Sequence, residues 1–222
     1  MSERLCIDLF SGLGGFSAAF SDADNWGVFR VDLSEDFNVD LHADVLDLRP
    51  SDLPSPDVVL ASPPCTAFSM AASGTHIDAD GSPVSEWGAE SLALVHHTVG
   101  LIAGLDPDWW FLENPMGGMR RVLGQPEAHV WWCQYGSKRA KPTDLWGDIP
   151  TRFERKKCTN GNEHCHHEPA PRGSDSGTQQ ADLSAAERAK IPYELSNEIR
   201  KAIEREYDSS RPKYKTATLE RY

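Results

Sequence analysis

The chain has 222 residues, of which 39% are hydrophobic and 25% are charged. This balance predicts one globular core with at most a small appendage. The sequence contains no run of 18 or more apolar residues, so we expect no membrane span and no membrane contact. The N-terminal residues do not resemble a signal peptide, and five scattered cysteines favour reduced thiols over a disulfide framework. We therefore expect a cytoplasmic protein of a prokaryotic or virus-infected cell.

The formal net charge of −12 bears on the partners that the chain can bind. An acidic protein repels nucleic acid at long range, because affinity for DNA comes largely from neutralised phosphates. Two basic stretches, residues 136–141 and 152–157, nevertheless lie close together in the sequence and predict a local basic patch. Adaptation to high salt is an alternative explanation of the acidity. The charge alone therefore does not exclude a nucleic-acid partner.

The first 150 residues alternate short β-like segments with helical or loop segments. We expect strands at residues 4–10, 26–32, 41–48, 56–62, 108–114, 128–136 and 143–148. We expect helices at residues 15–23 and 85–104, the second with apolar residues at helical spacing and acidic residues early in the segment. This alternation predicts an α/β fold, with a mostly parallel sheet covered by helices on both faces.

The composition changes after Pro150. Residues 149–190 are polar, rich in Gly, Pro, Ser and Asp, and predict an extended loop region. A helix is expected at residues 191–207, with proline in its first turn and apolar residues along one stripe. The tail at residues 208–222 is expected to be loosely held.

Several predicted strands end in residues that carry chemistry. A glycine-rich turn, Asp8–Gly15, closes the first strand, and Asp32 and Asp44 end the next two at positions where an acid can accept from ribose hydroxyls. Cys65 follows two prolines after the fourth strand, and Glu113 ends the fifth. Taken singly, the acids are typical of solvated turns and the cysteine of a small buried hydrophobe. Together they predict a thiol, a carboxylate and a nucleoside-containing cofactor at one sheet edge.

The segments DLFSGLGGF, SPPCTAFS, FLENP and YGSKRAKP, in this order and spacing, resemble the signature blocks of DNA cytosine-5 methyltransferases. The resemblance covers residues 5–146, and residues 189–199 resemble the family's last conserved helix, which returns to the cofactor site. It implies a Rossmann-like methyltransferase fold, with residues 1–148 as the catalytic domain. It also implies S-adenosylmethionine as the cofactor and cytosine-containing DNA as the partner.

The resemblance also implies the catalytic residues. Cys65 would add to C6 of a flipped cytosine, which makes C5 nucleophilic enough to attack the methyl group. Glu113 would hold the N3 edge and supply a proton, Asn114 would orient neighbouring backbone, and Arg139 would contact the base carbonyl. The same chemistry on RNA or with a modified donor is an alternative, as is a catalytically silent DNA-binding subunit.

The cofactor and DNA contacts follow from the same resemblance. It assigns the cofactor site to the glycine turn, two acids and a proline, namely Asp8, Phe10, Gly12, Gly14, Gly15, Asp32, Asp44 and Pro63. It implies DNA contacts for Ser69, Lys138 and Lys141, and residues 66–81 are expected to close over the flipped base. Thr66 and Pro115 stand where the family usually has glutamine and valine, and Lys141 stands for a second arginine. These departures concern how the DNA is held.

Residues 149–189 stand where the family carries a sizeable target-recognition domain. A region this short predicts short or relaxed sequence specificity, or help from a partner protein or second protomer. It contains Cys158, His164, Cys165 and His167, a set of thiols and imidazoles that could bind zinc. The spacing fits no standard zinc finger, and a polar histidine-rich loop is the alternative. Cys6 and Cys133 are predicted to be buried in apolar strands.

Overall fold

The computed structural model describes residues 4–72, 74–159, 165, 167–168 and 183–209. Within them, seven strands form one sheet in the order β3-β2-β1-β4-β5-β7-β6. The strands are β1 (Arg4–Leu9), β2 (Trp26–Asp32), β3 (Leu41–His42), β4 (Val58–Ala61), β5 (Trp109–Pro115), β6 (Ala128–Trp131) and β7 (Pro142–Gly147). The pairs from β3 to β5 are parallel, and β7 runs antiparallel to both of its neighbours. The mostly parallel α/β fold is confirmed.

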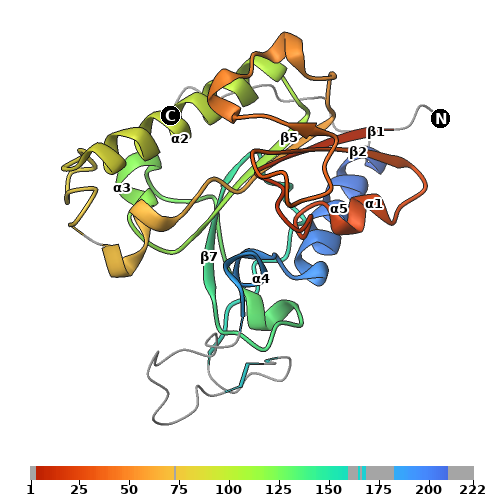
Figure 1. Ribbon diagram of the computed structural model, residues 1–222. Helices are drawn as coiled ribbons and strands as arrows, with labels where there is room; N and C mark the ends of the chain where they lie inside the picture. Colours follow the sequence, from red (N-terminus) through yellow and green to blue (C-terminus); the bar gives the residue numbers. More distant parts are fainter. Residues whose placement is uncertain (1–3, 73, 160–164, 166, 169–182, 210–222) are drawn as a thin grey trace.

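Helices cover both faces of this sheet (Figure 1). The α-helices are α1 (Ala18–Ser21), α2 (Glu86–Leu105), α3 (Met119–Leu123), α4 (Ala185–Ala189) and α5 (Tyr193–Asp208). Short 3-10 turns are η1 (Val45–Asp47), η2 (Pro50–Asp52), η3 (Thr66–Phe68), η4 (Met70–Ala72) and η5 (Trp132–Tyr135). Figure 1 shows α2 on one side of the strands, and α1 and α5 together on the other. Among the described residues, no helix is both long and apolar enough to cross a bilayer.

Two apolar clusters result from the alternation of side chains along the central strands. Ile7 and Leu9 of β1 face the cluster that contains α2, whereas Cys6 faces the cluster that contains α5. Successive residues of a strand point to opposite faces, so a strand buried on both sides reads as a continuous apolar run. This is why β4 is buried at all four of its positions. The core therefore holds the strand ends in fixed positions.

Several element boundaries differ from the sequence-based expectations. The strand expected at residues 41–48 is limited to β3, because Asp44 caps the 3-10 turn η1 through a hydrogen bond from the Leu46 amide. The strand expected at 128–136 ends at Trp131 and continues as η5, so Cys133 is buried but lies in a 3-10 turn. The helix expected at 15–23 is shortened to α1 by the preceding turn. Of the expected tail, residues 210–222 lie outside the described residues.

Candidate active site

A cavity of about 560 Å³ lies beside the carboxyl ends of β1, β4 and β5. It is the edge at which open α/β sheets bind their ligands. The cavity wall combines residues from both halves of the chain. Eight residues that the sequence predicted for catalysis, cofactor or DNA line it: Asp8, Phe10, Gly12, Gly15, Pro63, Cys65, Glu113 and Lys141.

The glycine-rich turn forms one wall of this cavity. Phe10, Gly12 and Gly14 have φ values of 61°, 51° and 68°, so the backbone is in the left-handed region at alternate positions. Gly14 N donates to Ser11 O over 2.8 Å, which closes the turn. At Gly15 a Cβ atom would lie 2.7 Å from Ile191 N, so the absent side chain allows the segment before α5 to approach. The turn is therefore packed directly against the C-terminal part of the chain.

Asp8 is a buried carboxylate on the cavity wall. Its Oδ2 accepts a 2.6 Å hydrogen bond from Ser17 Oγ, while Oδ1 accepts no well-formed hydrogen bond from the described residues. Burial raises the pKa of Asp8 to about 6, and the Ser17 hydrogen bond and the Ser11 hydroxyl beside Asp8 oppose this rise. A buried acceptor without a partner is costly. The position is thus suited to a ligand that brings a hydrogen-bond donor or a cation.

Asp32 and Asp44, the two acids predicted to hold the nucleoside, accept hydrogen bonds from backbone amides of the chain. Asp32 Oδ2 accepts from Gly12 N over 2.8 Å, and Oδ1 accepts from Ser34 N over 2.9 Å. Asp44 caps η1 as described above, and neither acid lines the cavity. Phe37, which the sequence did not single out, lines it instead. Asp32 therefore holds the glycine turn in place through the Gly12 amide.

Cys65 is held at the end of β4 by contacts from neighbouring elements. The Asn114 side chain donates from Nδ2 to Pro63 O over 3.0 Å, which ties the cysteine loop to the end of β5. Phe68 N donates to Cys65 O over 3.0 Å and starts the turn η3. The thiol is half-buried, and burial raises its pKa, while Lys141 lowers it and Glu113 raises it further. The thiol is thus presented on a backbone that is fixed on both sides.

Glu113 lies at the end of the neighbouring strand β5, with a residual exposure of 5%. Burial raises its pKa, and the nearby Lys141 ammonium opposes this rise. The Ser62 hydroxyl beside Glu113 also lowers this pKa, but Glu113 Oε1 accepts no well-formed hydrogen bond from the described residues. A buried carboxyl with a raised pKa and an unused oxygen is suited to hydrogen-bond the edge of a base and to exchange a proton with it.

Comparison with known proteins agrees with this geometry. Residues 5–120 match the family described as C-5 cytosine-specific DNA methylase. The "Probable DNA (cytosine-5)-methyltransferase" of Frog virus 3 (isolate Goorha) is 35% identical over 169 residues, which cover 72% of this chain and 76% of that protein. The chain belongs to the C-5 cytosine-specific DNA methylase family.

Two further similarities set the limits of the match. The "Type II methyltransferase M.HaeII" of Haemophilus aegyptius is 34% identical over 82 residues, 33% of this methylase and 26% of that protein. The solved Entamoeba histolytica methyltransferase EhMeth has a TM-score of 0.50 and 13% identity, over 72% of this chain and 58% of that one. The methylase thus spans little more than half of that solved chain, and the similarity supports the fold alone. Family and relatives indicate cytosine-5 methylation of DNA, with S-adenosylmethionine as the implied methyl donor.

Two of the methylase's basic residues, Lys141 and Arg139, share the ring of Trp132. Lys141 lies on the wall, with Nζ 3.7 Å from the centre of the Trp132 ring, and burial lowers its pKa while Glu113 and Cys65 raise it. Arg139 stacks on the same tryptophan at 5.0 Å but does not line the cavity. Its guanidinium donates to the carbonyls of Arg188 and Glu187 in α4, at 2.8 and 3.4 Å. Arg139 is therefore bound to α4, a short helix whose role in the cavity wall the sequence did not predict.

The loop after Cys65 is docked against α3. Gly118 N donates to Phe68 O over 2.6 Å, and Arg121 Nη1 donates to Ile77 O and Asp78 O over 3.4 and 3.3 Å. Ser69 Oγ donates to Thr66 O over 3.3 Å within the loop, and Ser69 does not line the cavity. Movement of this loop over a flipped base stays a prediction, and it would have to break these contacts.

S-adenosylmethionine fits the residues of this cavity. Two buried carboxylate oxygens of the cavity, Asp8 Oδ1 and Glu113 Oε1, accept no well-formed hydrogen bond within the described part of the chain, and the Ser11 and Ser62 hydroxyls lie beside these carboxylates. Polar atoms of this kind need a ligand or water as a partner. Phe10, Phe16 and Phe37 add aromatic surface to the same cavity. A ligand with an amino acid end and a nucleoside end matches this mixture.

Proposed function

We propose that the chain transfers a methyl group from S-adenosylmethionine to C5 of cytosine in DNA. The observation that carries the proposal is that Cys65 and Glu113 line one cavity together with the glycine turn. Asp8 would hold the ammonium of the donor, and Phe10 and Phe37 would contact its apolar parts. The donor supplies a methyl group on a sulfonium, which C5 of an unmodified cytosine is too weak a nucleophile to attack.

Cys65 and Glu113 provide the activation that cytosine needs. The Cys65 thiol loses its proton and its sulfur adds to C6 of a flipped base, which moves electron density to C5. Burial disfavours the thiolate, so the nearby Lys141 ammonium is needed to stabilise it. Glu113 donates a proton to N3 as negative charge accumulates on the ring. After methyl transfer, a water molecule takes the C5 proton, the Cys65 sulfur leaves C6 as thiolate, and N3 returns its proton to Glu113, which restores the aromatic ring.

The shortened recognition region bears on specificity. Lys138, Arg139 and Lys141 would contact DNA near the cavity, and residues 149–189 would make few contacts beyond them. The proposal is therefore a short or relaxed target sequence, or a recognition site completed by a partner protein or a second protomer. RNA as substrate is the competing proposal, because the proposed roles of Cys65 and Glu113 involve the base and not the sugar.

The decisive experiment is trapping with duplex DNA that contains 5-fluorocytosine. The fluorine blocks the last elimination, so the enzyme should remain covalently attached in the presence of S-adenosylmethionine and migrate as a shifted band on a denaturing gel. The Cys65→Ala variant should give no such band, and tritium transfer to DNA should fall at least about a thousandfold. The Cys6→Ala variant is the matched control, because that thiol is buried in β1 outside the cavity.

Different outcomes separate the alternatives. No adduct and no tritium incorporation on cytosine-containing DNA, at low and at high salt, would rule out the proposal. Incorporation on tRNA but not on duplex DNA would favour the RNA alternative. DNA binding without either signal would indicate a catalytically silent subunit.

A further inference from the structure

Four metal-binding side chains converge outside the cavity, where the polar recognition region meets η5. Their ligand atoms, from Cys133, Cys158, Cys165 and His167, all lie within 4.8 Å of one another. Cys133 comes from η5 in the catalytic domain, and the other three come from the polar region that follows. His164, which the sequence suggested as a ligand, lies outside the described residues. Cys133 thus completes a set of three thiols and one imidazole that was not evident from the sequence.

The distances agree with a tetrahedral zinc site. Cys158 Sγ lies 3.5 Å from Cys165 Sγ and 3.5 Å from His167 Nδ1. Zinc–sulfur bonds of about 2.3 Å place the sulfurs of a tetrahedral site about 3.8 Å apart. The shortest pair, Cys165 Sγ and His167 Nδ1 at 2.7 Å, would have to separate by about 1 Å around a metal. Rotation of the half-buried His167 or Cys165 side chain can supply this change.

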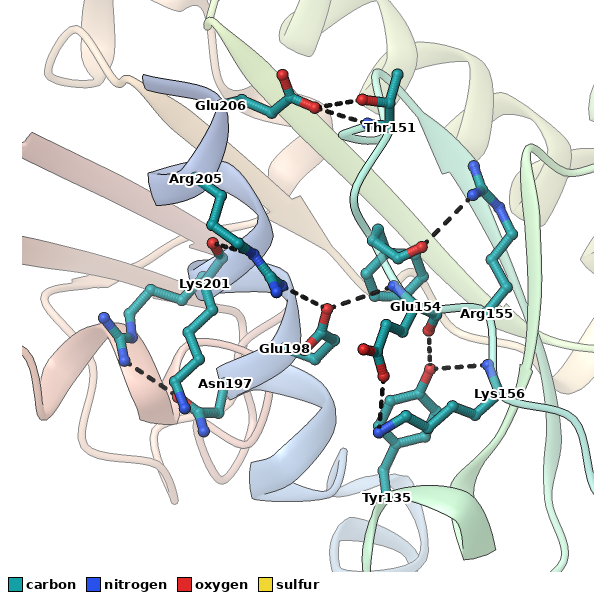
Figure 2. Close-up of polar contacts among 12 residues, drawn as sticks. Tyr135, Thr151, Glu154, Arg155, Lys156, Asn197, Glu198, Lys201, Arg205 and Glu206 are labelled. Atoms are coloured by element: carbon teal, nitrogen blue, oxygen red, sulfur yellow. Dashed lines mark hydrogen bonds and ion pairs between the residues drawn. The ribbon is translucent and has the colours of Figure 1, made fainter. Parts of the chain in front are cut away.

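Core packing holds only the start of the polar region, where Phe153 is buried in the apolar cluster that contains α5. The described residues of this region, 149–159, 165 and 167–168, contain no helix or strand. Hydrogen bonds hold its first half: Glu154 N donates to Glu198 of α5 over 3.3 Å, and Lys156 N donates to Tyr135 of η5 over 3.2 Å (Figure 2). Thiols are weak hydrogen-bonding groups, so a cluster of three gains little from contacts among themselves. Small segments without a core of their own usually need a metal or a disulfide.

We propose that Cys133, Cys158, Cys165 and His167 bind one zinc ion, which fastens the polar region to the catalytic domain. Four protein ligands leave no open coordination position, so the site is structural. Binding releases the protons of the three thiols, so zinc affinity rises with pH.

The consequence for the enzyme follows from the neighbours of Cys133. The next residue toward the N-terminus, Trp132, supports Arg139 and Lys141 through its ring. Directly after His167, Glu168 N donates to Lys138 O over 2.9 Å. The metal thus holds the polar region beside the loop that carries these three basic residues. Its loss should weaken DNA binding and leave the cofactor cavity intact.

Metal content of the purified full-length chain tests the proposal, and it needs no methyl transfer, so its failure is distinct from failure of the proposed function. Protein prepared under reducing conditions without chelator should contain about one zinc per chain by elemental mass spectrometry. Each of Cys133→Ser, Cys158→Ser and His167→Asn should lower this content at least about tenfold. Cys6→Ser, a buried thiol outside the cluster, should retain it. Substitution by cobalt should give the absorption bands of a tetrahedral thiolate site.

Several results would overturn the proposal. Reduced protein that takes up less than about a tenth of an equivalent of zinc would do so. Retention of zinc by Cys133→Ser, or its loss in His164→Gln, would show that the ligand set is wrong. If Cys158 and Cys165 form a disulfide, and the reduced protein takes up no zinc, these cysteines are a redox pair and not metal ligands. Because Cys133 is buried, the half-buried Cys158 and His167 variants, with circular dichroism as a check on folding, keep the test valid if Cys133→Ser fails to fold.

Discussion

The catalytic cavity and the polar region after β7 are held together by different forces. Cys65 follows the buried strand β4 and Glu113 lies near the end of the adjacent strand β5, so their spacing is set by the β4–β5 ladder and the two apolar clusters around it. In the polar region, the described residues 149–159, 165 and 167–168 bury Phe153 in the core, make hydrogen bonds to α5 and η5, as Figure 2 shows, and in our proposal hold one metal ion. Displacing Cys65 or Glu113 would require disruption of the core, whereas the part of the polar region around the proposed metal ligands can loosen while the core stays intact.

This difference bears on our proposal that residues 149–189 make few contacts with DNA. The chemistry needs reacting groups held within a fraction of an ångström, which a parallel sheet provides without help from the recognition region. Recognition depends on surface contacts that can be reduced, replaced or supplied by another protein. Changes in the polar region should therefore lower specificity before they lower the ability to bind the cofactor. The predictions below test this division, beginning with the cavity.

Glu113→Gln should cause the largest effect, a loss of about 10²–10⁴-fold in kcat. Burial raises the pKa of Glu113, so its carboxyl keeps the proton needed for N3 at higher pH than an exposed glutamate would. As pH rises through this raised pKa, the wild-type rate should lose the contribution of the protonated form. The variant has no titrating group there and should lack this fall. Tritium transfer measured against pH provides the test.

The matched control for Glu113→Gln is Glu90→Gln, an exposed glutamate on α2. It should leave both kcat and the pH profile unchanged. Equal pH profiles for wild type and Glu113→Gln, with rates within about threefold, would mean that Glu113 does not handle a proton.

Asp8→Asn tests whether the cavity is maintained at a cost to stability. Burial raises the folded-state pKa of Asp8 to about 6 from an ordinary 3.8, so the folded state binds more protons than the unfolded state between these values. The wild-type free energy of unfolding should then fall by on the order of 2 kcal/mol as pH rises from 4 to 7. The variant should show a flatter pH dependence, greater stability at pH 7, and weaker S-adenosylmethionine binding.

Urea unfolding at several pH values measures this effect, and Asp24→Asn at an exposed position is the control. Parallel stability curves for wild type and Asp8→Asn would contradict the prediction. Unchanged cofactor affinity would show separately that Asp8 Oδ1 is not a ligand contact.

Gly15→Ala should move the segment around Ile191, which forms part of the cavity wall, away from the glycine turn. The new Cβ would lie 2.7 and 2.8 Å from the backbone N and O of Ile191, so that segment must shift. Overpacking of this kind costs about 1–2 kcal/mol. Because Ile191 and Lys190 line the cavity, cofactor affinity should fall about tenfold as well. Calorimetric titration and thermal unfolding measure the two effects.

Gly100→Ala is the contrasting substitution. A Cβ at this exposed position in α2 meets no atom within 4 Å, so alanine should stabilise the helix by up to about 1 kcal/mol. Cofactor affinity should not change. Equal losses in both glycine variants would indicate that the contact with Ile191 is unimportant.

The sequence predicted the fold class and several of the cavity residues because both depend on local patterns. Apolar runs predict the central strands, and residues directly after parallel strands must share one sheet edge. Asp8, Cys65 and Glu113 meet at the cavity for this reason. The shortened α1 illustrates a local conflict: a turn with repeated left-handed backbone delays the helix beyond the glycines.

The remaining features depend on contacts between distant segments. Asp32 ends a strand as predicted, but its carboxylate is used by the Gly12 and Ser34 amides instead of lining the cavity. Helix α4 contributes to the cavity wall because the chain comes back to the cavity after the polar region. The hydrophobic periodicity of the sequence does not encode where this return takes place. Cys133 lies 25 residues before Cys158 in a segment that resembles a strand, so its place among metal ligands emerges from the way β6 turns into η5.

Glu168→Gln should produce the smallest change, confined to DNA binding. Lys138 Nζ lies 2.9 Å from Glu168 Oε1, and both side chains are largely exposed, so the ion pair adds little to stability. Removing the carboxylate frees the ammonium for phosphate and should raise DNA affinity about twofold at low salt, with the gain fading as salt is added. Lys138→Gln should instead lower the affinity and reduce the slope of log K against log salt by about 0.9. Fluorescence anisotropy with a labelled duplex at two salt concentrations separates these outcomes. Identical salt slopes for all three proteins would mean that DNA does not reach the loop beside the polar region, and recognition would then depend on another surface or another chain.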